Sequence, residues 1–469
     1  MPPTIALLLT ILFIAVLYAR DYKERCTPSL ALLIPSVWIL IHGSRSVSEW
    51  ANVLLGVNVA GGDVAEGSPL DRNVTFVLMA AGLAVLLKRG ISWSNVFRSN
   101  PWLILFFLYC ALSIAWSDFP LLALKRWFKA LADPIMVLIV LTDRDPLKAL
   151  DIVLRTMVYF LVPFSVLFVK YYPHLGRTYS EWTGAASYGG VTTNKNALGF
   201  VLMLCGLALV WRLYRTGNAK SWNKIDNVGM PLVLLLMVGW LFQIADSMTS
   251  FVCFLIGVTL FVVLGFSTIR KHLSVYLIVG VLVFLVLQAT VNVTDLLLSG
   301  TGRDGTLTGR TALWAVLLPM QQQPVFGYGF ESFWLGDRLT KLQSLWYWKP
   351  TQAHSGYIEL YLNLGWIGWL FFGAVILSCY WKMTKLLTMG RWMDDRLLFG
   401  RLGVTYLLVY LLYNYTEAGF KSLHLLFLFF LLFTMVDVSR GGLVKSVSAA
   451  LPGRARNISA TVVDPLPTV

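Results

Sequence analysis

"TQAHSGYIELYLNLGWIGWLFFGAVILSCY" runs from Thr351 to Tyr380. From Gly356 onward this stretch is apolar, and Glu359 is its one charged side chain. An apolar run of this length can cross a hydrocarbon core of about 30 Å as an α-helix. The stretch therefore predicts a membrane-spanning helix over residues 356–380, with a histidine, His354, just before it.

The rest of the chain repeats this pattern. Its 469 residues are 57% hydrophobic and only 13% charged, which leaves too little polar surface for a soluble protein of this size. The apolar runs are continuous and do not alternate, which favours helices over a membrane barrel. We therefore predict an all-α, polytopic integral membrane protein of twelve or thirteen spans. The predicted spans are about 3–19, 28–42, 73–87, 102–117, 130–142, 151–169, 195–214, 228–245, 249–268, 272–291, 356–380, 397–415 and 420–437.

Lys and Arg residues set the predicted orientation. They are concentrated in one set of alternate short loops and in the C-terminal tail, which marks that side as cytoplasmic. Thirteen spans would place the N-terminus outside, whereas twelve would place it inside. The predicted regions are N-terminal transmembrane helices 1–291, a large periplasmic loop 292–355 with an amphipathic helix, C-terminal transmembrane helices 356–437, and a disordered cytoplasmic tail 438–469.

Composition also argues against several kinds of site. None of the five cysteines forms a Cys-x-x-Cys pair, and the five histidines are scattered, so we expect no disulfide frame, metal site or cofactor. The formal charge of +14 is explained by the positive charge of the cytoplasmic loops, so it does not predict a nucleic-acid partner.

Several cations lie on the predicted outer side, where this charge bias disfavours them. Arg126 and Lys195 each lie at the end of a span, where they must face the bundle, a cavity or the headgroups. Arginine can bind phosphate oxygens in a bidentate fork, so converging cations suit a polyanion such as a diphosphate. The alternative is ordinary solvated charge, particularly for Arg338, Lys341 and Lys349 in the long loop.

The long outer loop contains two informative stretches. Residues 310–322 have helical spacing of apolar residues, which predicts a short helix on the membrane surface, broken near Pro319. The glycine-rich residues 302–309 could form a backbone nest for an anion. The following aromatic cluster is either an interfacial belt or a platform for sugar rings; it comprises Phe326, Tyr328, Phe330, Phe333 and Trp334.

His354 differs from the other histidines because it lies on the outer side, where the cationic loop meets a span. Imidazole can accept a proton near neutral pH, so His354 is a candidate general base. The alternative is a structural histidine at the interface. Glu359 and Glu417 lie at or inside spans, where ionisable groups are functional candidates by default, although each could be a structural ion pair.

These stretches resemble a known family. "HSGYIELYLNLGWIG" resembles the histidine-centred signature of the O-antigen ligases and of related O-antigen and exopolysaccharide polymerases. Other stretches follow in the order that this family shows: "AWSDFPLLALKR", "GVTTNKNALG", "GRTALW", "PVFGYGFESFW" and "NYTEAGF". The resemblance covers about residues 28–437, and "IHGSRSVSEW" resembles the exopolysaccharide-production branch. The family norm is twelve spans with both ends inside, so a thirteenth span would depart from it. Gly365 and Gly368 are interpreted as close-packing positions.

The resemblance implies a metal-independent glycosyltransferase of the bacterial inner membrane, with the GT-C-like helical fold of lipid-carrier-dependent transferases. Its donor would be a glycan on undecaprenyl diphosphate, presented at the periplasmic face. His354 would accept the proton of the acceptor hydroxyl, and direct attack on the anomeric carbon would invert its configuration. The predicted catalytic residues are His354, Arg310 and Glu417, and the predicted substrate-binding residues are Arg126, Lys195, Asn196, Arg303 and Glu359.

The acceptor stays open between two alternatives. A polymerase would use another carrier-linked repeat unit, and a ligase would use lipid A core; "GSRSVSEW" and "NYTEAGF" favour the polymerase. The expected partners are these glycans, membrane lipid, and a flippase and chain-length regulator of a polysaccharide assembly system. A non-catalytic transporter of lipid-linked sugar is a further alternative. Against it, the sequence has neither a repeat that relates its halves nor paired Gly/Pro-broken helices.

Overall fold

The chain folds almost wholly into α-helices. The computed structural model describes residues 1–22, 29–56, 67–179, 184–216, 228–291, 310–389 and 394–438. Within these ranges the strands are a single short antiparallel pair, β1 (Arg177–Tyr179) and β2 (Ala186–Tyr188). The prediction of an all-α polytopic membrane protein is confirmed.

Each of the thirteen predicted apolar runs coincides with a helix. The helices of the first half are α1 (Pro3–Tyr22), η1 (Leu30–Leu32), α2 (Leu33–His42), α3 (Val47–Leu55), α4 (Pro69–Lys88), α5 (Trp93–Ser99), α6 (Pro101–Leu112), η2 (Ser113–Trp116), α7 (Pro120–Ala130), α8 (Ala132–Leu141), α9 (Pro146–Tyr171), α10 (Pro173–Gly176) and α11 (Lys195–Thr216). Those of the second half are α12 (Met230–Ala245), α13 (Met248–Val263), α14 (Ser267–Lys271), α15 (Leu273–Val291), α17 (Arg310–Leu317), α18 (Gly336–Leu345), α19 (Gly356–Met389), α20 (Asp395–Thr416) and α21 (Leu425–Met435).

Length and composition separate these helices into classes. Among the described residues, seven helices are long and apolar enough to cross a membrane, or up to nine if each sharply bent pair counts as one span. Helices α12, α13 and α21 are apolar but shorter. The expected twelve or thirteen spans therefore include several helices that are short for a full crossing.

Two helix pairs are bent, which the sequence did not predict. The chain bends by 69° between α2, which continues η1, and α3. It bends by 94° between α5 and α6. Ser46 starts α3 afresh with a capping box to Glu49. Pro101 starts α6, because proline has no N–H to continue a helix and disfavours helical geometry at Asn100. Both bends lie within the first 116 residues, so among the described residues they are not a matched pair from two halves.

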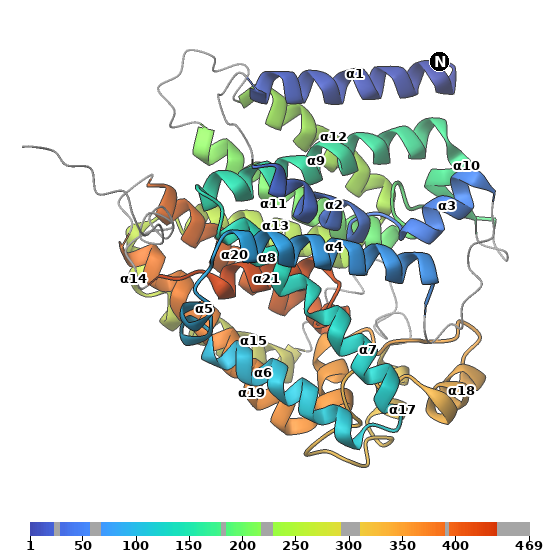
Figure 1. The fold of residues 1–469 in the computed structure, drawn as a ribbon, viewed down its shortest axis with the longest axis vertical. Coiled ribbons are helices and arrows are strands. Elements are labelled where there is room, and N and C mark those ends of the chain that lie inside the picture. Colours follow the sequence, from blue (N-terminus) through green and yellow to red (C-terminus); the bar gives the residue numbers. More distant parts are fainter. Residues whose placement is uncertain are drawn as a thin grey trace, which may run out of the picture.

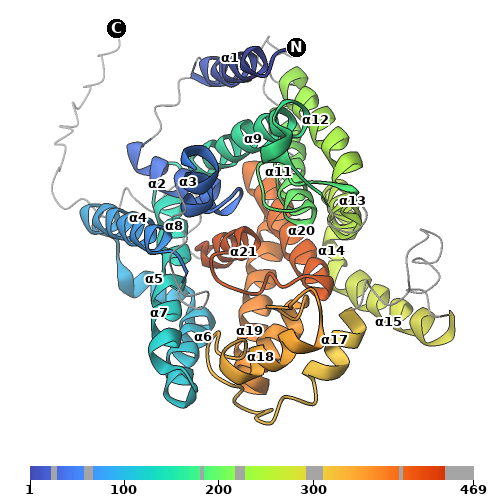
Figure 2. The ribbon, with the colours of Figure 1, turned by 90° about the vertical axis from the view of Figure 1, so that its right-hand side faces the viewer.

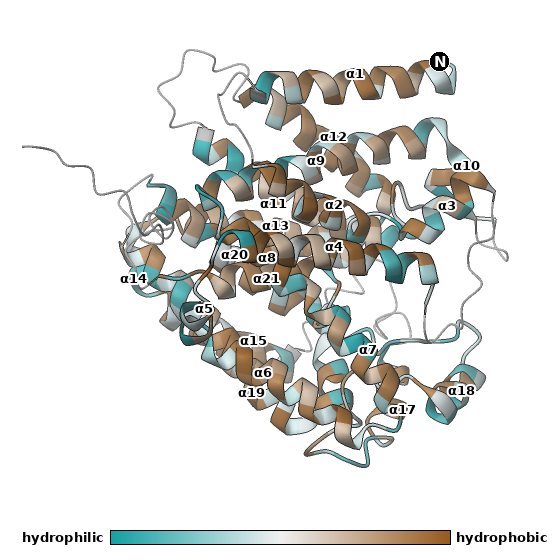
Figure 3. Cartoon of the chain, viewed as in Figure 1, coloured by the Kyte–Doolittle hydropathy of each residue, from teal (hydrophilic) through white to brown (hydrophobic). Residues whose placement is uncertain are grey.

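The elements are arranged around a buried centre. Helices α5 and α14 lie at one end of the molecule, and α3, α10 and α18 lie at the other (Figure 1). Helices α1 and α15 lie at the periphery, whereas α21 is surrounded by other helices (Figure 2). Hydrophobic residues cover the helices, and hydrophilic residues gather at elements such as α5 and α18 (Figure 3).

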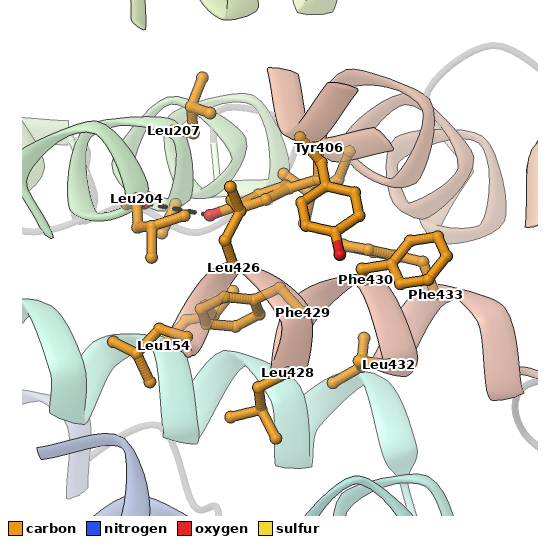
Figure 4. Close-up of a cluster of buried hydrophobic side chains, with 14 of the residues drawn as sticks. Leu154, Leu204, Leu207, Tyr406, Leu426, Leu428, Phe429, Phe430, Leu432 and Phe433 are labelled. Carbon is orange, nitrogen blue, oxygen red and sulfur yellow. Dashed lines mark hydrogen bonds between the residues drawn. The ribbon is translucent and has the colours of Figure 1, made fainter. Parts of the chain in front are cut away.

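The core is held by large apolar side chains on α11, α20 and α21. All residues of α21 are buried, and most of them are Leu or Phe. The Tyr406 ring packs against Phe429 and Phe433, with ring centroids 5.4 and 5.5 Å away. Its hydroxyl donates a hydrogen bond of 3.0 Å to the Leu204 carbonyl oxygen, which satisfies the one polar atom of this side chain (Figure 4).

The peripheral helix α1 is attached to the bundle by charge. Asp21 Oδ1 lies 3.0 Å from Arg155 Nη1 on α9 and 2.9 Å from Arg212 Nη2 on α11. Asp151 also pairs with Arg155, at 2.5 Å. Because these side chains are largely buried, removing one partner should cost far more than breaking a surface pair.

Replacing Asp21 with Asn should therefore destabilise the protein by about 3 kcal/mol, because two buried guanidinium groups lose a counter-charge. The measurement is the thermal unfolding midpoint of the purified protein in detergent. The matched control is Asp145→Asn, since Asp145 pairs with Lys148 at an exposed position. Equal midpoints for the two variants would contradict the role given to Asp21.

Candidate active site

The described part of the long loop 292–355 forms a compact unit against the start of α19. Its own hydrophobic cluster is separate from the main core and contains Leu313, Leu317, Tyr328, Phe333, Leu342, Ala353 and Leu362. The predicted helix is present as α17, and it ends at Leu317, before Pro319. Tyr328 and Phe333 are core residues of this unit, so neither the belt nor the sugar-platform interpretation holds for them.

The structure brings His354, Glu417 and Arg310 together, and we call these residues the trio. Glu417 Oε1 lies 2.7 Å from Arg310 Nη2, and Glu417 Oε2 lies 3.7 Å from His354 Nδ1. Arg310 is the first residue of α17, Glu417 directly follows α20, and His354 lies two residues before the start of α19. One carboxylate therefore bridges an arginine and a histidine from separate parts of the chain.

The two ring nitrogens of His354 have different surroundings. Nδ1 is buried without a hydrogen-bond partner and faces Glu417, whereas the side chain as a whole is 25% exposed. The 3.7 Å separation is longer than a hydrogen bond, although catalytic contacts of this kind often tighten when substrate binds. Nε2 is therefore the nitrogen available to a ligand.

The backbone at His354 is strained and firmly held. Its φ of 51° is unusual for a residue other than glycine and costs on the order of 1–3 kcal/mol. Both backbone groups of Ala353 are fixed by side chains: its N–H donates to Glu359 Oε1 at 2.5 Å, and its carbonyl accepts from Trp314 Nε1 at 2.7 Å. After the histidine, Gly356 N donates to the Glu417 carbonyl oxygen at 2.9 Å.

Glu359 has three protein donors around its carboxylate. Besides Ala353 N, Trp334 Nε1 donates to Oε2 at 2.8 Å, and Asn363 Nδ2 donates to the same oxygen at 3.4 Å. All three partners are N–H donors, so both carboxylate oxygens act as hydrogen-bond acceptors within the protein. Trp334 and Asn363 were missed as partners by sequence reasoning, although Asn363 lies one helical turn after Glu359 and could have been suspected from its spacing.

Gly365 breaks α19, so the predicted span 356–380 is not one continuous helix; the close packing expected at this glycine is confirmed, because a Cβ there would overlap the Val325 carbonyl oxygen. Its φ of 63° and ψ of −163° interrupt the helix after Leu364. The residues 324–329 fill the gap. Pro324 and Val325 carbonyls accept from the N–H groups of Trp366 and Ile367, and the Leu362 and Asn363 carbonyls accept from the N–H groups of Tyr328 and Gly329.

Two side chains also donate hydrogen bonds to backbone carbonyls near the break. Tyr109 donates its hydroxyl to the Leu364 carbonyl at 2.9 Å, and Gln321 Nε2 donates to the Tyr361 carbonyl at 2.7 Å. A helix end inside a membrane requires such partners because no water is present to replace them. The break therefore turns residues 356–364 into a short separate helix that begins next to His354 and carries Glu359.

The remaining predicted residues lie outside the trio. Arg126 Nη1 donates to the Glu331 carbonyl, and Glu331 Oε1 accepts from Ser422 Oγ at 3.1 Å. Lys195 pairs with Asp246 at 3.2 Å. Asn196, in the first turn of α11, is partly buried. Within the described ranges, Lys195 and Asn196 make no hydrogen bond or ion pair with the trio. Arg303 and the glycine-rich residues 302–309 lie outside the described residues.

Arg126 and the trio are linked by residues 417–424, which we call the crossing segment because it joins α20 to α21. Glu417 begins it, Lys421 Nζ donates to Gln352 Oε1 at 3.2 Å, and Ser422 reaches Glu331. Leu423 N donates to Asp133 Oδ2 at 2.8 Å. Asp133 therefore accepts a hydrogen bond from a backbone N–H of this distant segment.

Metal ligands are not gathered in the described part of the chain. No group of three or more His, Cys, Asp or Glu residues there is placed to hold a metal ion. The four cysteines within those ranges, Cys110, Cys205, Cys253 and Cys379, are free and buried.

Comparison with known proteins finds a matching family model. Residues 232–373 match the family model described as O-Antigen ligase. This part of the chain is similar to the O-antigen ligases. The match contains Arg310, His354 and Glu359, whereas Glu417 and Arg126 lie beyond its ends.

Individual proteins that are similar to this chain have names that refer to polysaccharides. The exopolysaccharide production protein ExoQ of Rhizobium meliloti (strain 1021) is 24% identical over 317 residues, which is 65% of this chain and 70% of ExoQ. A putative polysaccharide ligase of Rickettsia felis is 27% identical over 206 residues, which is 41% of this chain and 49% of that protein. A second one, of Rickettsia conorii, is 28% identical over 163 residues, or 33% of this chain and 40% of that protein.

Replacing Gly365 with Ala should destabilise the protein by about 1–3 kcal/mol. A Cβ atom at this positive φ would overlap the Val325 carbonyl oxygen and push residues 324–329 away from the break. The measurement is again the unfolding midpoint in detergent. Gly373→Ala is the matched control, since a Cβ there meets nothing within 4 Å. A Gly365→Ala midpoint that equals the control would argue against the break as a structural requirement.

Proposed function

We propose that this protein is a membrane glycosyltransferase that transfers or polymerises undecaprenyl-diphosphate-linked glycan at the periplasmic face of the bacterial inner membrane. The observation that carries the proposal is the trio, in which a carboxylate lies between a histidine and an arginine beside the mouth of a broken membrane helix. The relation to O-antigen ligases and ExoQ supports the substrate class.

His354 acts as the general base. Nε2 accepts the proton of an acceptor hydroxyl, and the hydroxyl oxygen forms a bond to the anomeric carbon of the donor. The bond between that carbon and the diphosphate oxygen breaks, so undecaprenyl diphosphate leaves with the electron pair and the anomeric configuration inverts. Glu417, on the Nδ1 side, holds the ring in place and stabilises the imidazolium that forms.

Positive charge stabilises the leaving diphosphate. Arg310 turns Nη2 toward Glu417, and a guanidinium has five N–H donors in all, so it can bind a phosphate oxygen at the same time. Arg126 approaches from the other end of the crossing segment. Lys195 and Asn196 complete the proposed set together with Arg303, which lies outside the described residues. This electrostatic assistance is the usual way to stabilise charge that develops on a leaving group.

Glu359 has a different role in this proposal from the substrate binding that its position suggested. Its carboxylate already meets Ala353 N, Trp334 Nε1 and Asn363 Nδ2. We therefore assign it as a positioning residue that fixes the strained backbone at His354.

The acceptor distinguishes two forms of the same reaction. A polymerase would extend a carrier-linked repeat unit, as the name of ExoQ suggests for exopolysaccharide production. A ligase would transfer the glycan to lipid A core. In either form the protein would work with the flippase and chain-length regulator of a polysaccharide assembly system.

Replacing His354 with Ala should lower glycan transfer by about 100-fold or more, because the acceptor hydroxyl loses its base. The assay uses purified protein in lipid nanodiscs with an undecaprenyl-diphosphate-linked oligosaccharide, and product length is read on a gel. His272→Ala is the control, since His272 is an exposed histidine directly after α14, and α14 lies on the opposite side of the molecule from α17 (Figure 1). A His354→Ala protein that is correctly folded and fully active would sink the proposed mechanism.

Replacing Glu359 with Gln should lower kcat about tenfold and leave the donor KM unchanged. The amide would place an NH₂ group against another N–H donor, so the backbone before His354 would lose one of its restraints. Glu49→Gln is the matched control, because Glu49 only caps α3 at the surface. A rise in donor KM at constant kcat would instead assign Glu359 to substrate binding.

A further inference from the structure

Three consecutive aromatic residues, Trp346, Tyr347 and Trp348, follow the end of α18. Tyr347 is 75% exposed and Trp348 is 45% exposed. Lys349 closes the turn with a φ of 44°, and its N–H donates to the Trp346 carbonyl oxygen at 3.1 Å. The turn therefore holds two large rings outward at a fixed place.

Ring contacts through Trp346 and Trp348 connect the hydrophobic cluster of the long loop to His354 of the trio. Trp346 packs against that cluster, and its ring centroid lies 6.4 Å from that of Trp348. The Trp348 ring in turn lies 5.7 Å from the His354 ring, at an angle of 57°. Trp348 is thus an anchored but exposed ring next to the proposed base.

We propose that Trp348, flanked by Tyr347, is the binding platform for the acceptor sugar. This inference rests on the proposed function and adds the place of the acceptor to it. An aromatic ring presents a flat apolar face that packs against the C–H face of a sugar, while the sugar hydroxyls at the rim stay free for polar contacts. A sugar on Trp348 would present a rim hydroxyl to His354 Nε2.

The position of Trp348 beside His354, and not beside Arg310, assigns the platform to the acceptor sugar and not to the donor. Arg310 meets Oε1 of Glu417 and His354 meets Oε2, so the arginine and the histidine approach the carboxylate through different oxygens. Trp348 contacts the histidine. The diphosphate of the donor belongs at the arginine, and the hydroxyl to be deprotonated belongs at the histidine beside Trp348.

The alternative is that these rings only anchor the loop at the membrane interface, where Trp and Tyr are common. Trp102 offers a direct comparison. It is 46% exposed and lies in the first turn of α6, directly after α5, whereas Trp348 directly follows α18 at the other end of the molecule (Figure 1). Interfacial anchoring predicts similar effects of substitution at the two tryptophans, and a sugar platform predicts an effect at Trp348 alone.

The experiment measures acceptor binding separately from turnover. The probe is the repeat-unit oligosaccharide released from the cells' own polysaccharide, titrated into full-length protein in nanodiscs and followed by saturation-transfer NMR. The variants are Trp348→Ala, Trp348→Phe, Trp348→Leu and Trp102→Ala, each also made with His354→Ala. With the histidine in place, acceptor and donor KM are measured as well.

We expect Trp348→Ala and Trp348→Leu to weaken oligosaccharide binding and raise the acceptor KM about tenfold, with the donor KM unchanged. Trp348→Phe keeps a flat ring and should stay within about threefold of the natural protein. The platform would be overturned by any of three results: unchanged oligosaccharide binding in Trp348→Ala, natural binding strength in Trp348→Leu, or a loss of binding in Trp102→Ala equal to that in Trp348→Ala. Oligosaccharide binding in the His354→Ala background does not depend on catalysis. The binding result can therefore be interpreted even if His354 proves not to be the general base.

Discussion

A helix that breaks inside a membrane must find hydrogen-bond partners for the backbone groups it frees, and this constraint organises the site. At Gly365, α19 obtains those partners from residues 324–329 of the long loop. The loop therefore cannot be displaced without exposing polar groups to lipid. In return, the break leaves a short helix whose start can lie at the surface of the bundle, where His354 meets α17 and the end of α20.

The trio follows from that arrangement. Glu417 meets Arg310 through one oxygen and faces His354 through the other, which links cation and base through a single carboxylate. Glu359 is the second acidic group nearby, and its setting is different because it accepts from three N–H donors. In the proposed mechanism these two carboxylates have separate tasks: Glu417 would face the reacting groups, and Glu359 fixes the backbone before the histidine.

Helices outside the site hold its parts in position. Helices α20 and α21 are packed into the core through Tyr406 and its aromatic neighbours, and they fix both ends of the crossing segment. The crossing segment is then connected to the long loop at three places: Glu417 faces His354, Lys421 donates to Gln352, and Ser422 donates to Glu331. Peripheral α1 depends instead on buried ion pairs with α9 and α11, because it packs little of its own surface against the bundle.

The sequence by itself determined the helical membrane fold, the position of the apolar helices, and His354, Arg310 and Glu417 as candidates. It could do so because hydropathy and charge placement are local properties of the chain. Only the tertiary structure decided the bends at α2–α3 and α5–α6, the break at Gly365, the partners of Glu359 and the place of Trp348 beside His354. These features depend on contacts between residues far apart in sequence: Gly365 reads as an ordinary packing glycine until residues 324–329 are seen to occupy its gap.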